Sequence, residues 1–195
     1  MKAIVSIICL AASAAALAAP VMPDPDPRAR PRLGDNGVTM GTVHIAYEET
    51  TLAAVRAQAG IGVLRHQADA TITRSWLCYV LPDRVRAVWL IANGEGASTR
   101  AITQVQVGPI DPSEQCPLLP EALQPLKFHN GASAGMSSDA LRKALGTPSG
   151  ASPREMTWVS EEKVQEQRDR ARLRIFKVRL KNGLVDALQA GQTTY

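Results

Sequence analysis

The sequence predicts an α+β protein of two similar halves, each with short helices packed on an antiparallel β-sheet. A short, capped helix pattern occurs at residues 51–60 and again at residues 137–146, and strand-like runs follow each copy. A proline-rich stretch, residues 108–125, separates the two patterns and is typical of a connection. These three observations favour two helix-plus-sheet units joined by a linker.

The N-terminus has the layout of a secretory signal peptide. Lys2 gives a positive start, residues 3–17 form an apolar run, and Ala16 and Ala18 are small residues at the positions that a signal peptidase reads. The run is too short for a membrane span, and prolines follow it. We expect the mature chain, from Ala19 onward, to be soluble in the periplasm or secreted.

Residues 19–37 are rich in proline and charge and are predicted to be a flexible tether, because proline lacks an N–H and interrupts helices and strands. The expected organisation is a signal peptide at 1–18, the tether at 19–37, a first half at 38–107, a proline-rich linker at 108–130 and a second half at 131–195.

The second helix pattern carries strong local signals. Ser137 is a favourable N-cap, and Met136 and Leu141 stand at the two positions of a hydrophobic staple. Gly146 can end the helix in the left-handed conformation, and Pro148 prevents its continuation. We expect a short helix that begins and ends at these residues.

The first helix pattern matches the second at a distance of 86 positions. Thr51, Val55 and Gly60 correspond to Ser137, Leu141 and Gly146. Strand-like runs follow at residues 71–80, 85–92 and 101–107, and again at 157–160, 173–180 and 184–190. Asn182-Gly183 predicts a hairpin turn between the last two runs. The correspondence indicates a tandem repeat. The highly charged residues 161–172 suggest a solvated face or a long hairpin arm.

Cys78 and Cys116 are the two cysteines of the predicted mature chain. In an oxidising compartment they predict one disulfide bond, the alternative being a free nucleophilic thiol. Cys9 lies in the signal peptide after Ile8, whereas lipid attachment needs a small residue there. We expect no membrane anchor after cleavage.

The first predicted hairpin, with its loop at residues 81–84, alternates between two faces. One face is nearly all apolar and is predicted to meet the helices: Ile72, Trp76, Cys78, Val80, Val85, Ala87, Trp89 and Ile91. The other combines an apolar patch with a polar rim, which is typical of a protein interface. Its candidate partner-binding residues are Leu77, Tyr79, Arg86, Val88, Leu90, Gln104 and Gln106. The alternative is that another part of the chain covers this face.

Several kinds of chemistry lack support in the sequence. The formal net charge of +4 comes without a basic stripe interleaved with aromatics, so we expect no nucleic-acid partner. The histidines His44, His66 and His129 show no metal-ligand spacing, and we expect no metal and no cofactor. Serine-hydrolase and phosphate-binding motifs are missing too. The sequence therefore predicts no catalytic residue.

The segment G-M-S-S-D-A-L-R-K-A-L-G-T-P-S, residues 135–149, resembles the helical signature of two families: the small outer-membrane assembly lipoproteins and the β-lactamase inhibitor protein. In both, a helix ending in L-G-x-P precedes an antiparallel sheet. The tandem arrangement, covering residues 39–107 and 134–194, is similar to the inhibitor protein in particular. The resemblance implies the fold, and suggests inhibition or envelope assembly. The single predicted disulfide and the missing lipid-anchor cysteine depart from the two families.

These observations lead to one expected function and two alternatives. We expect an exported, soluble, non-catalytic module that binds another envelope or secreted protein, as an inhibitor or immunity-type protein of the bacterial envelope. One alternative is a structural accessory of envelope or outer-membrane assembly. The other is a small-ligand binder or an enzyme of unrecognised type.

Overall fold

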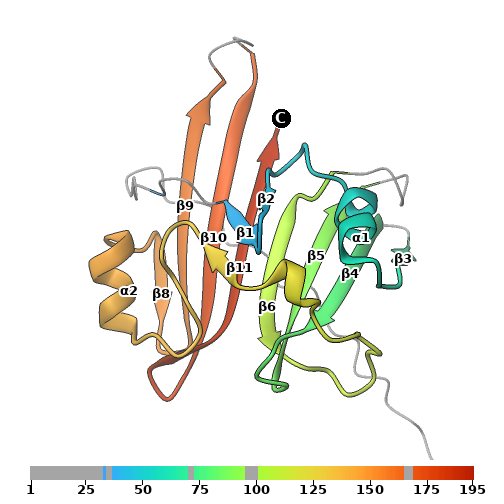
Figure 1. Ribbon diagram of the computed structural model, residues 1–195. Helices are drawn as coiled ribbons and strands as arrows, with labels where there is room; N and C mark the ends of the chain where they lie inside the picture. Colours follow the sequence, from blue (N-terminus) through green and yellow to red (C-terminus); the bar gives the residue numbers. More distant parts are fainter. Residues whose placement is uncertain (1–32, 34–36, 70–72, 95–100, 165–168) are drawn as a thin grey trace, which may run out of the picture.

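Figure 1 shows the computed structural model of the chain, which describes residues 33, 37–69, 73–94, 101–164 and 169–195. The predicted signal peptide, residues 1–18, lies outside the described residues. So does the predicted tether, apart from Leu33 and Gly37. No helix of the described part has the length and apolar character needed to cross a membrane.

The described strands form two antiparallel sheets. The large sheet has eight strands in the order β3-β4-β5-β6-β11-β10-β9-β8. Their bounds are β3 Arg65–Ala68, β4 Thr73–Val80, β5 Arg86–Asn93, β6 Gln104–Pro109, β8 Gly150–Ser152, β9 Glu155–Lys163, β10 Ala171–Lys181 and β11 Leu184–Thr194. The small sheet has the order β2-β1-β7, with β1 at Val38–Met40, β2 at Val43–Ile45 and β7 at Leu126–Phe128.

The predicted fold class, α+β in two similar halves, is wrong. The described residues hold eleven strands and only two α-helices, α1 (Leu52–Ala59) and α2 (Ser138–Leu145), with one 3-10 turn, η1 (Glu121–Leu123). The protein is mostly β, because strands β1, β2 and β7 supply part of the layer that the prediction assigned to helices. In addition, β6 pairs with β11, so the strands that follow the two helices belong to one continuous sheet.

Both predicted helices are confirmed together with their N-caps. The Thr51 hydroxyl accepts a hydrogen bond from the Ala54 N–H at 3.1 Å, and the Ser137 hydroxyl accepts one from the Ala140 N–H at 3.2 Å. Gly60 ends α1 in the left-handed conformation. Gly146 ends α2 at a φ of 79° but a ψ of −164°, so its predicted left-handed conformation is wrong, although glycine still permits the positive φ. These signals are local, so the sequence alone identifies them.

The predicted strand runs and the Asn182-Gly183 turn also occur in the structure, with φ of 54° and 76° at the two turn residues. Strand β9 extends to Lys163 and β10 begins at Ala171, so residues 161–163 and 171–172 of the charged segment lie in these two paired strands. Residues 165–168 lie outside the described part.

One face of the large sheet is covered by α1, the small sheet and α2, which lie side by side in front of it in Figure 1. Leu52 and Val55 of α1 are fully buried, as is Leu141 of α2. Phe128 of β7 meets Phe176 of β10 edge-on, with ring centroids 6.1 Å apart. The main core therefore lies between this covering layer and the large sheet.

Glu48 connects the covering layer to the last strand. Its carboxylate accepts hydrogen bonds from the Thr194 N–H and hydroxyl, both at 2.6 Å, and from Gln192 Nε2 at 3.0 Å. Burial raises the pKa of Glu48, but the bonds from Thr194 and Gln192 and the charge of Arg172 together bring it below its usual value. The ionised carboxylate thus ties the turn before α1 to the end of β11.

Strands β4 and β5 alternate between two faces as predicted, but the face that packs against α1 and the small sheet is the opposite one. On the face predicted to be core, Cys78, Ala87 and Ile91 are nevertheless buried at 8% exposure or less, and Ile72 lies outside the described residues. Four residues of the predicted interface are each 0% exposed and belong to the core: Leu77, Tyr79, Val88 and Leu90. Trp76 and Trp89, predicted to be core, are partly exposed on the other face. Alternation shows which residues share a face, whereas the position of α1 and the small sheet decides which face is covered.

The hairpin register also differs from the prediction. Val80 pairs with Ala87 rather than Val85, because the Leu81 N–H donates to the Arg86 carbonyl and the loop is longer than expected. A shift of two residues leaves the alternation unchanged. The predicted interface is therefore wrong because the covering layer lies on the other face of the hairpin, and not because the register differs.

Replacing Tyr79 tests this assignment. Tyr79→Ala should lower the free energy of unfolding by about 3–5 kcal/mol, because it removes a fully buried ring. Tyr79→Phe should cost about 1 kcal/mol, since only the hydroxyl, which donates to the Ile61 carbonyl at 3.0 Å, is lost. Urea denaturation of both variants measures the two values. A Tyr79→Ala protein that unfolds within about 0.5 kcal/mol of the wild type would contradict the burial of Tyr79.

Candidate functional site

The predicted linker, residues 108–130, runs from one face of the large sheet to the other. Cys116 lies on the uncovered side, bonded to Cys78 of β4, and the predicted disulfide is confirmed. The chain then runs beside the end of β4, where the Val80 N–H donates to the Pro117 carbonyl and the Leu119 N–H donates to the Val80 carbonyl. Leu123 and Phe128 follow in the core. The disulfide therefore fixes the segment that connects the two faces.

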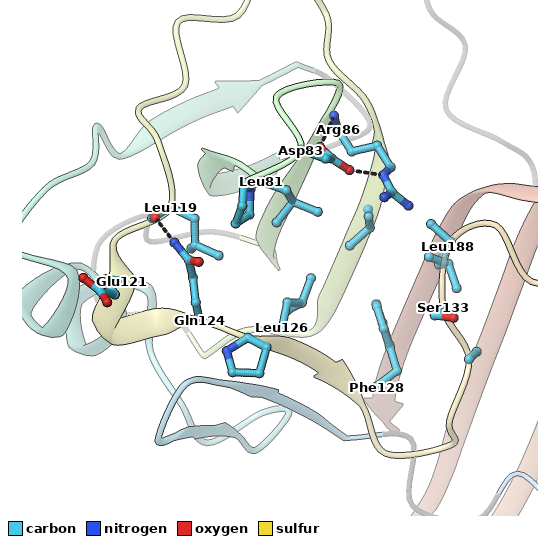
Figure 2. Close-up of a pocket in the computed structure, with 15 residues that line it drawn as sticks. Leu81, Asp83, Arg86, Leu119, Glu121, Gln124, Leu126, Phe128, Ser133 and Leu188 are labelled. Carbon is cyan, nitrogen blue, oxygen red and sulfur yellow. Dashed lines mark hydrogen bonds and ion pairs between the residues drawn. The ribbon is translucent and has the colours of Figure 1, made fainter.

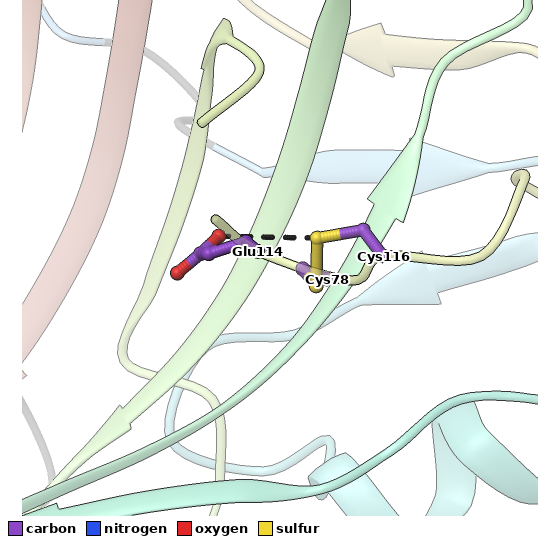
Figure 3. A group of neighbouring side chains, drawn as sticks. All are labelled: Cys78, Glu114 and Cys116. Atoms are coloured by element: carbon purple, nitrogen blue, oxygen red, sulfur yellow. Dashed lines mark hydrogen bonds between the residues drawn. A yellow bond between two sulfur atoms is a disulfide. The ribbon is translucent and has the colours of Figure 1, made fainter. Parts of the chain in front are cut away.

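Glu114 lies beside the disulfide, as Figure 3 shows. One ligand atom from each of Cys78, Glu114 and Cys116 falls within 4.8 Å of the others, and this trio is the one group of metal-ligating type found among the described residues. Metal binding by cysteine needs a thiolate, and here both sulfur atoms are bonded to each other. The trio in this oxidised form offers only one carboxylate, and the bond likewise removes the free nucleophilic thiol.

The uncovered face of the large sheet carries two tryptophans. The strand registers place Trp76 and Trp89 on this face together with Ile91, Gln106 and Gln189. Trp76 lies opposite Ile91 and Trp89 opposite Cys78, so the indoles are diagonal neighbours on adjacent strands. A cavity of about 450 Å³ lies over these residues. This face is the candidate functional site.

The two indoles differ in their hydrogen bonding. Trp89 Nε1 donates to the Glu114 carboxylate at 2.5 Å, which holds that ring against the linker. Trp76 Nε1 is buried and has no hydrogen-bond partner within the described residues. The Arg74 guanidinium lies 5.5 Å from the Trp76 ring centre in a cation–π contact. An unpaired, buried donor is costly to the folded state.

Among the described residues, the cavity has two ion pairs, and its other two acidic residues are held by neutral groups: Asp111 by Ser113 and Glu114 by Trp89. Lys177 Nζ lies 2.8 Å from the Glu155 carboxylate, and the Arg179 guanidinium lies 2.5 Å from Asp186. The Arg74 guanidinium donates to Gln67 as well as contacting Trp76. Recognition on this face would therefore rest on the indoles and the glutamine amides more than on net charge.

The structure divides the predicted partner-binding residues among three places. Leu77, Tyr79, Val88 and Leu90 lie in the core. Gln104 and Gln106 lie on the uncovered face, opposite Ile91 and Trp89, because the pairing of β5 with β6 puts them there. Arg86 lies at the end of the hairpin, ion-paired with Asp83. Only the two glutamines belong to the candidate site.

The sequence pattern predicted Trp76 and Trp89 to be core residues and so missed their partial exposure on this face. It also missed one contact between histidines. His44 of β2 and His129, next to β7, stack with ring centroids 5.0 Å apart, and His129 Nε2 lies 2.6 Å from the Thr39 hydroxyl. Strands β2 and β7 both pair with β1, which brings these distant residues together. No spacing in the sequence signals this contact, since it depends on the small sheet.

In comparisons with protein-family models, with curated proteins and with solved structures, no match to this chain was found. The resemblance of residues 135–149 to the inhibitor and lipoprotein signatures therefore stays a prediction.

Removing the disulfide tests its structural role. The double variant Cys78→Ala/Cys116→Ala should lose about 3–4 kcal/mol of unfolding free energy, because the bond closes a loop with a sequence separation of 38. Urea denaturation measures the loss. As a control, a reducing agent should destabilise the wild type by a similar amount and leave the double variant unchanged. Equal stability of the wild type and the double variant would contradict this role.

Proposed function

We propose that this protein is an exported, soluble, non-catalytic module that binds another protein of the bacterial envelope. The binding surface is the uncovered face of the large sheet, centred on Trp76 and Trp89. An inhibitor or immunity-type role is the specific form of the proposal. The sheet would cover a site on the partner, and no reaction would take place on this chain.

The observation that carries the proposal is the pair of tryptophans on a face that the covering layer leaves open. Tryptophan is among the residues most enriched at the energetic centres of protein interfaces, since its ring buries a large area with few rotamers to fix. The glutamines Gln106 and Gln189, beside the indoles, supply amides that can bond to a partner's backbone.

The expected partner surface follows from these groups. It should place an apolar side chain against the two indoles. The paired charges at the edge of the cavity, Lys177 with Glu155 and Arg179 with Asp186, would form the polar rim. A sheet held by pairing on both sides of each central strand loses little conformational entropy on binding, which favours affinity.

The disulfide supports the exported part of the proposal. Disulfide bonds persist in oxidising compartments such as the periplasm and the cell exterior, and they are rare in the bacterial cytoplasm. The N-terminal signal-peptide pattern points in the same direction. We therefore place the expected partner among periplasmic or secreted proteins.

Affinity capture with a matched pair of variants tests the proposal. Gln106→Lys places a charge in the middle of the uncovered face, whereas Gln58→Lys places the same charge on the exposed side of α1. The wild type and Gln58→Lys should retain the same protein from an envelope extract, and Gln106→Lys should lose it. With the purified partner, Trp76→Ala should raise the dissociation constant at least tenfold, because the contact with the indole ring is removed.

The outcomes separate the candidate functions. Retention of one periplasmic or secreted enzyme, with loss of its activity on binding, supports the inhibitor role. Retention of outer-membrane assembly components would replace it with a structural role in envelope assembly. If Gln106→Lys retains the partner as well as Gln58→Lys does, the uncovered face is not the binding surface.

A further inference from the structure

A second cavity, of about 660 Å³, lies on the covered side of the large sheet (Figure 2). It occupies a gap in the covering layer, between the hairpin loop at residues 81–86, the segment from η1 to β7, and residues 132–134. Val107 of β6 and Leu188 of β11, which share the inner face of the sheet, contribute to its wall. The cavity thus reaches the core from the protein surface.

The wall of this cavity is mostly apolar. Its aliphatic and aromatic side chains are Leu81, Val107, Leu119, Leu126, Phe128 and Leu188. Four of these, Val107, Leu119, Phe128 and Leu188, are buried at 8% exposure or less, so they form a fixed inner surface. The polar lining residues are Asp83, Arg86, Glu121, Gln124 and Ser133. A cavity of this volume that combines a buried apolar wall with a few such groups can hold a small molecule.

Arg86 supplies a positive group at the rim. Its Nε donates to the Asp83 carboxylate at 2.5 Å, while no bond of its two terminal nitrogens occurs within the described residues. Asp83 is itself held by the N–H groups of Val85 and Arg86, at 3.0 and 3.1 Å. This arrangement orients the guanidinium and leaves two terminal nitrogens to meet a ligand.

The charge state of Asp83 is consistent with this role. Burial raises the pKa of the Asp83 carboxyl, but the bonds from the Val85 N–H and from Arg86, with the charge of Arg86, bring the pKa below its usual value. Asp83 is therefore ionised at neutral pH and continues to orient Arg86.

We propose that this cavity binds one long-chain carboxylate, with the aliphatic chain along the apolar wall and the carboxylate on the terminal nitrogens of Arg86. The wall has two acidic residues: Asp83, which is already ion-paired with Arg86, and Glu121, which lies at the opposite end of the cavity from Arg86 in Figure 2. The charge of Glu121 repels a carboxylate, so the head group is directed to the Arg86 end. A guanidinium pairs with a carboxylate through two parallel hydrogen bonds, which a neutral or cationic head group cannot accept in the same way.

This site is separate from the proposed protein-binding face. Strand β5 presents Val88 and Leu90 to the covered side and Trp89 to the other, so the sheet lies between the two sites. A failure of one proposal therefore leaves the other intact.

Calorimetric titration with dodecanoate tests the proposal, using protein purified from the envelope fraction of cells that express the full chain. One dodecanoate should bind per chain. Arg86→Gln should weaken dodecanoate at least tenfold and change the affinity for dodecanol less than twofold, because only the head-group contact is lost. Arg84→Gln is the control, since it removes the same charge from the same loop outside the cavity wall. Equal weakening by both variants, or no dodecanoate binding to the wild type, overturns the proposal.

A second pair of variants tests the position of the chain without touching Arg86. Ala134→Leu adds bulk to the cavity wall, whereas Ala144→Leu adds the same bulk on the exposed side of α2. Ala134→Leu should weaken both dodecanoate and dodecanol, and Ala144→Leu should weaken neither. Unchanged binding to a folded Ala134→Leu protein would show that the ligand lies elsewhere and would overturn the proposal. Thermal melting of each variant confirms that it is folded.

Discussion

Strand β6 pairs with β11, with Val107 opposite Leu188 and Val105 opposite Ala190, and this pairing joins eight strands into a single sheet. Because side chains alternate along each strand, the same register puts Gln106 and Gln189 together on the opposite face. A slip of one residue would exchange the two faces along every strand beyond it. The uncovered tryptophan face and the wall of the Arg86 cavity both depend on this one register.

Local features protect that register. Gly191 pairs with Gln104, and a Cβ atom at this position would lie 3.0 Å from the Thr103 carbonyl oxygen, so a larger residue would press on the neighbouring backbone. Just beyond it, Glu48 holds Thr194 and Gln192 through three hydrogen bonds. The end of β11 is thereby fixed both to β6 and to the turn before α1. The Glu48 bonds join segments that are more than a hundred residues apart in the chain.

The parts that could be predicted from the sequence are those with local signals. The caps of α1 and α2 lie within a few residues of each helix. The disulfide bond could be predicted because the expected compartment is oxidising and the mature chain has two cysteines. The small sheet could not be predicted, because each of its strands has only three residues and their pairing is non-local. This omission had a consequence for the site. Both faces of the β4–β5 hairpin carry large apolar residues, and only the position of the covering layer shows that Tyr79 is inside and Trp76 outside.

Oxidative footprinting of the native protein, read by mass spectrometry, tests this assignment of the two faces most directly. The chain contains internal standards, since Tyr195 is 59% exposed and Trp158 is 0% exposed. The account predicts that Trp76 and Trp89 are modified faster than Trp158, and that Tyr79 is protected relative to Tyr195. Modification of Tyr79 as fast as Tyr195, with Trp76 and Trp89 protected like Trp158, would contradict it.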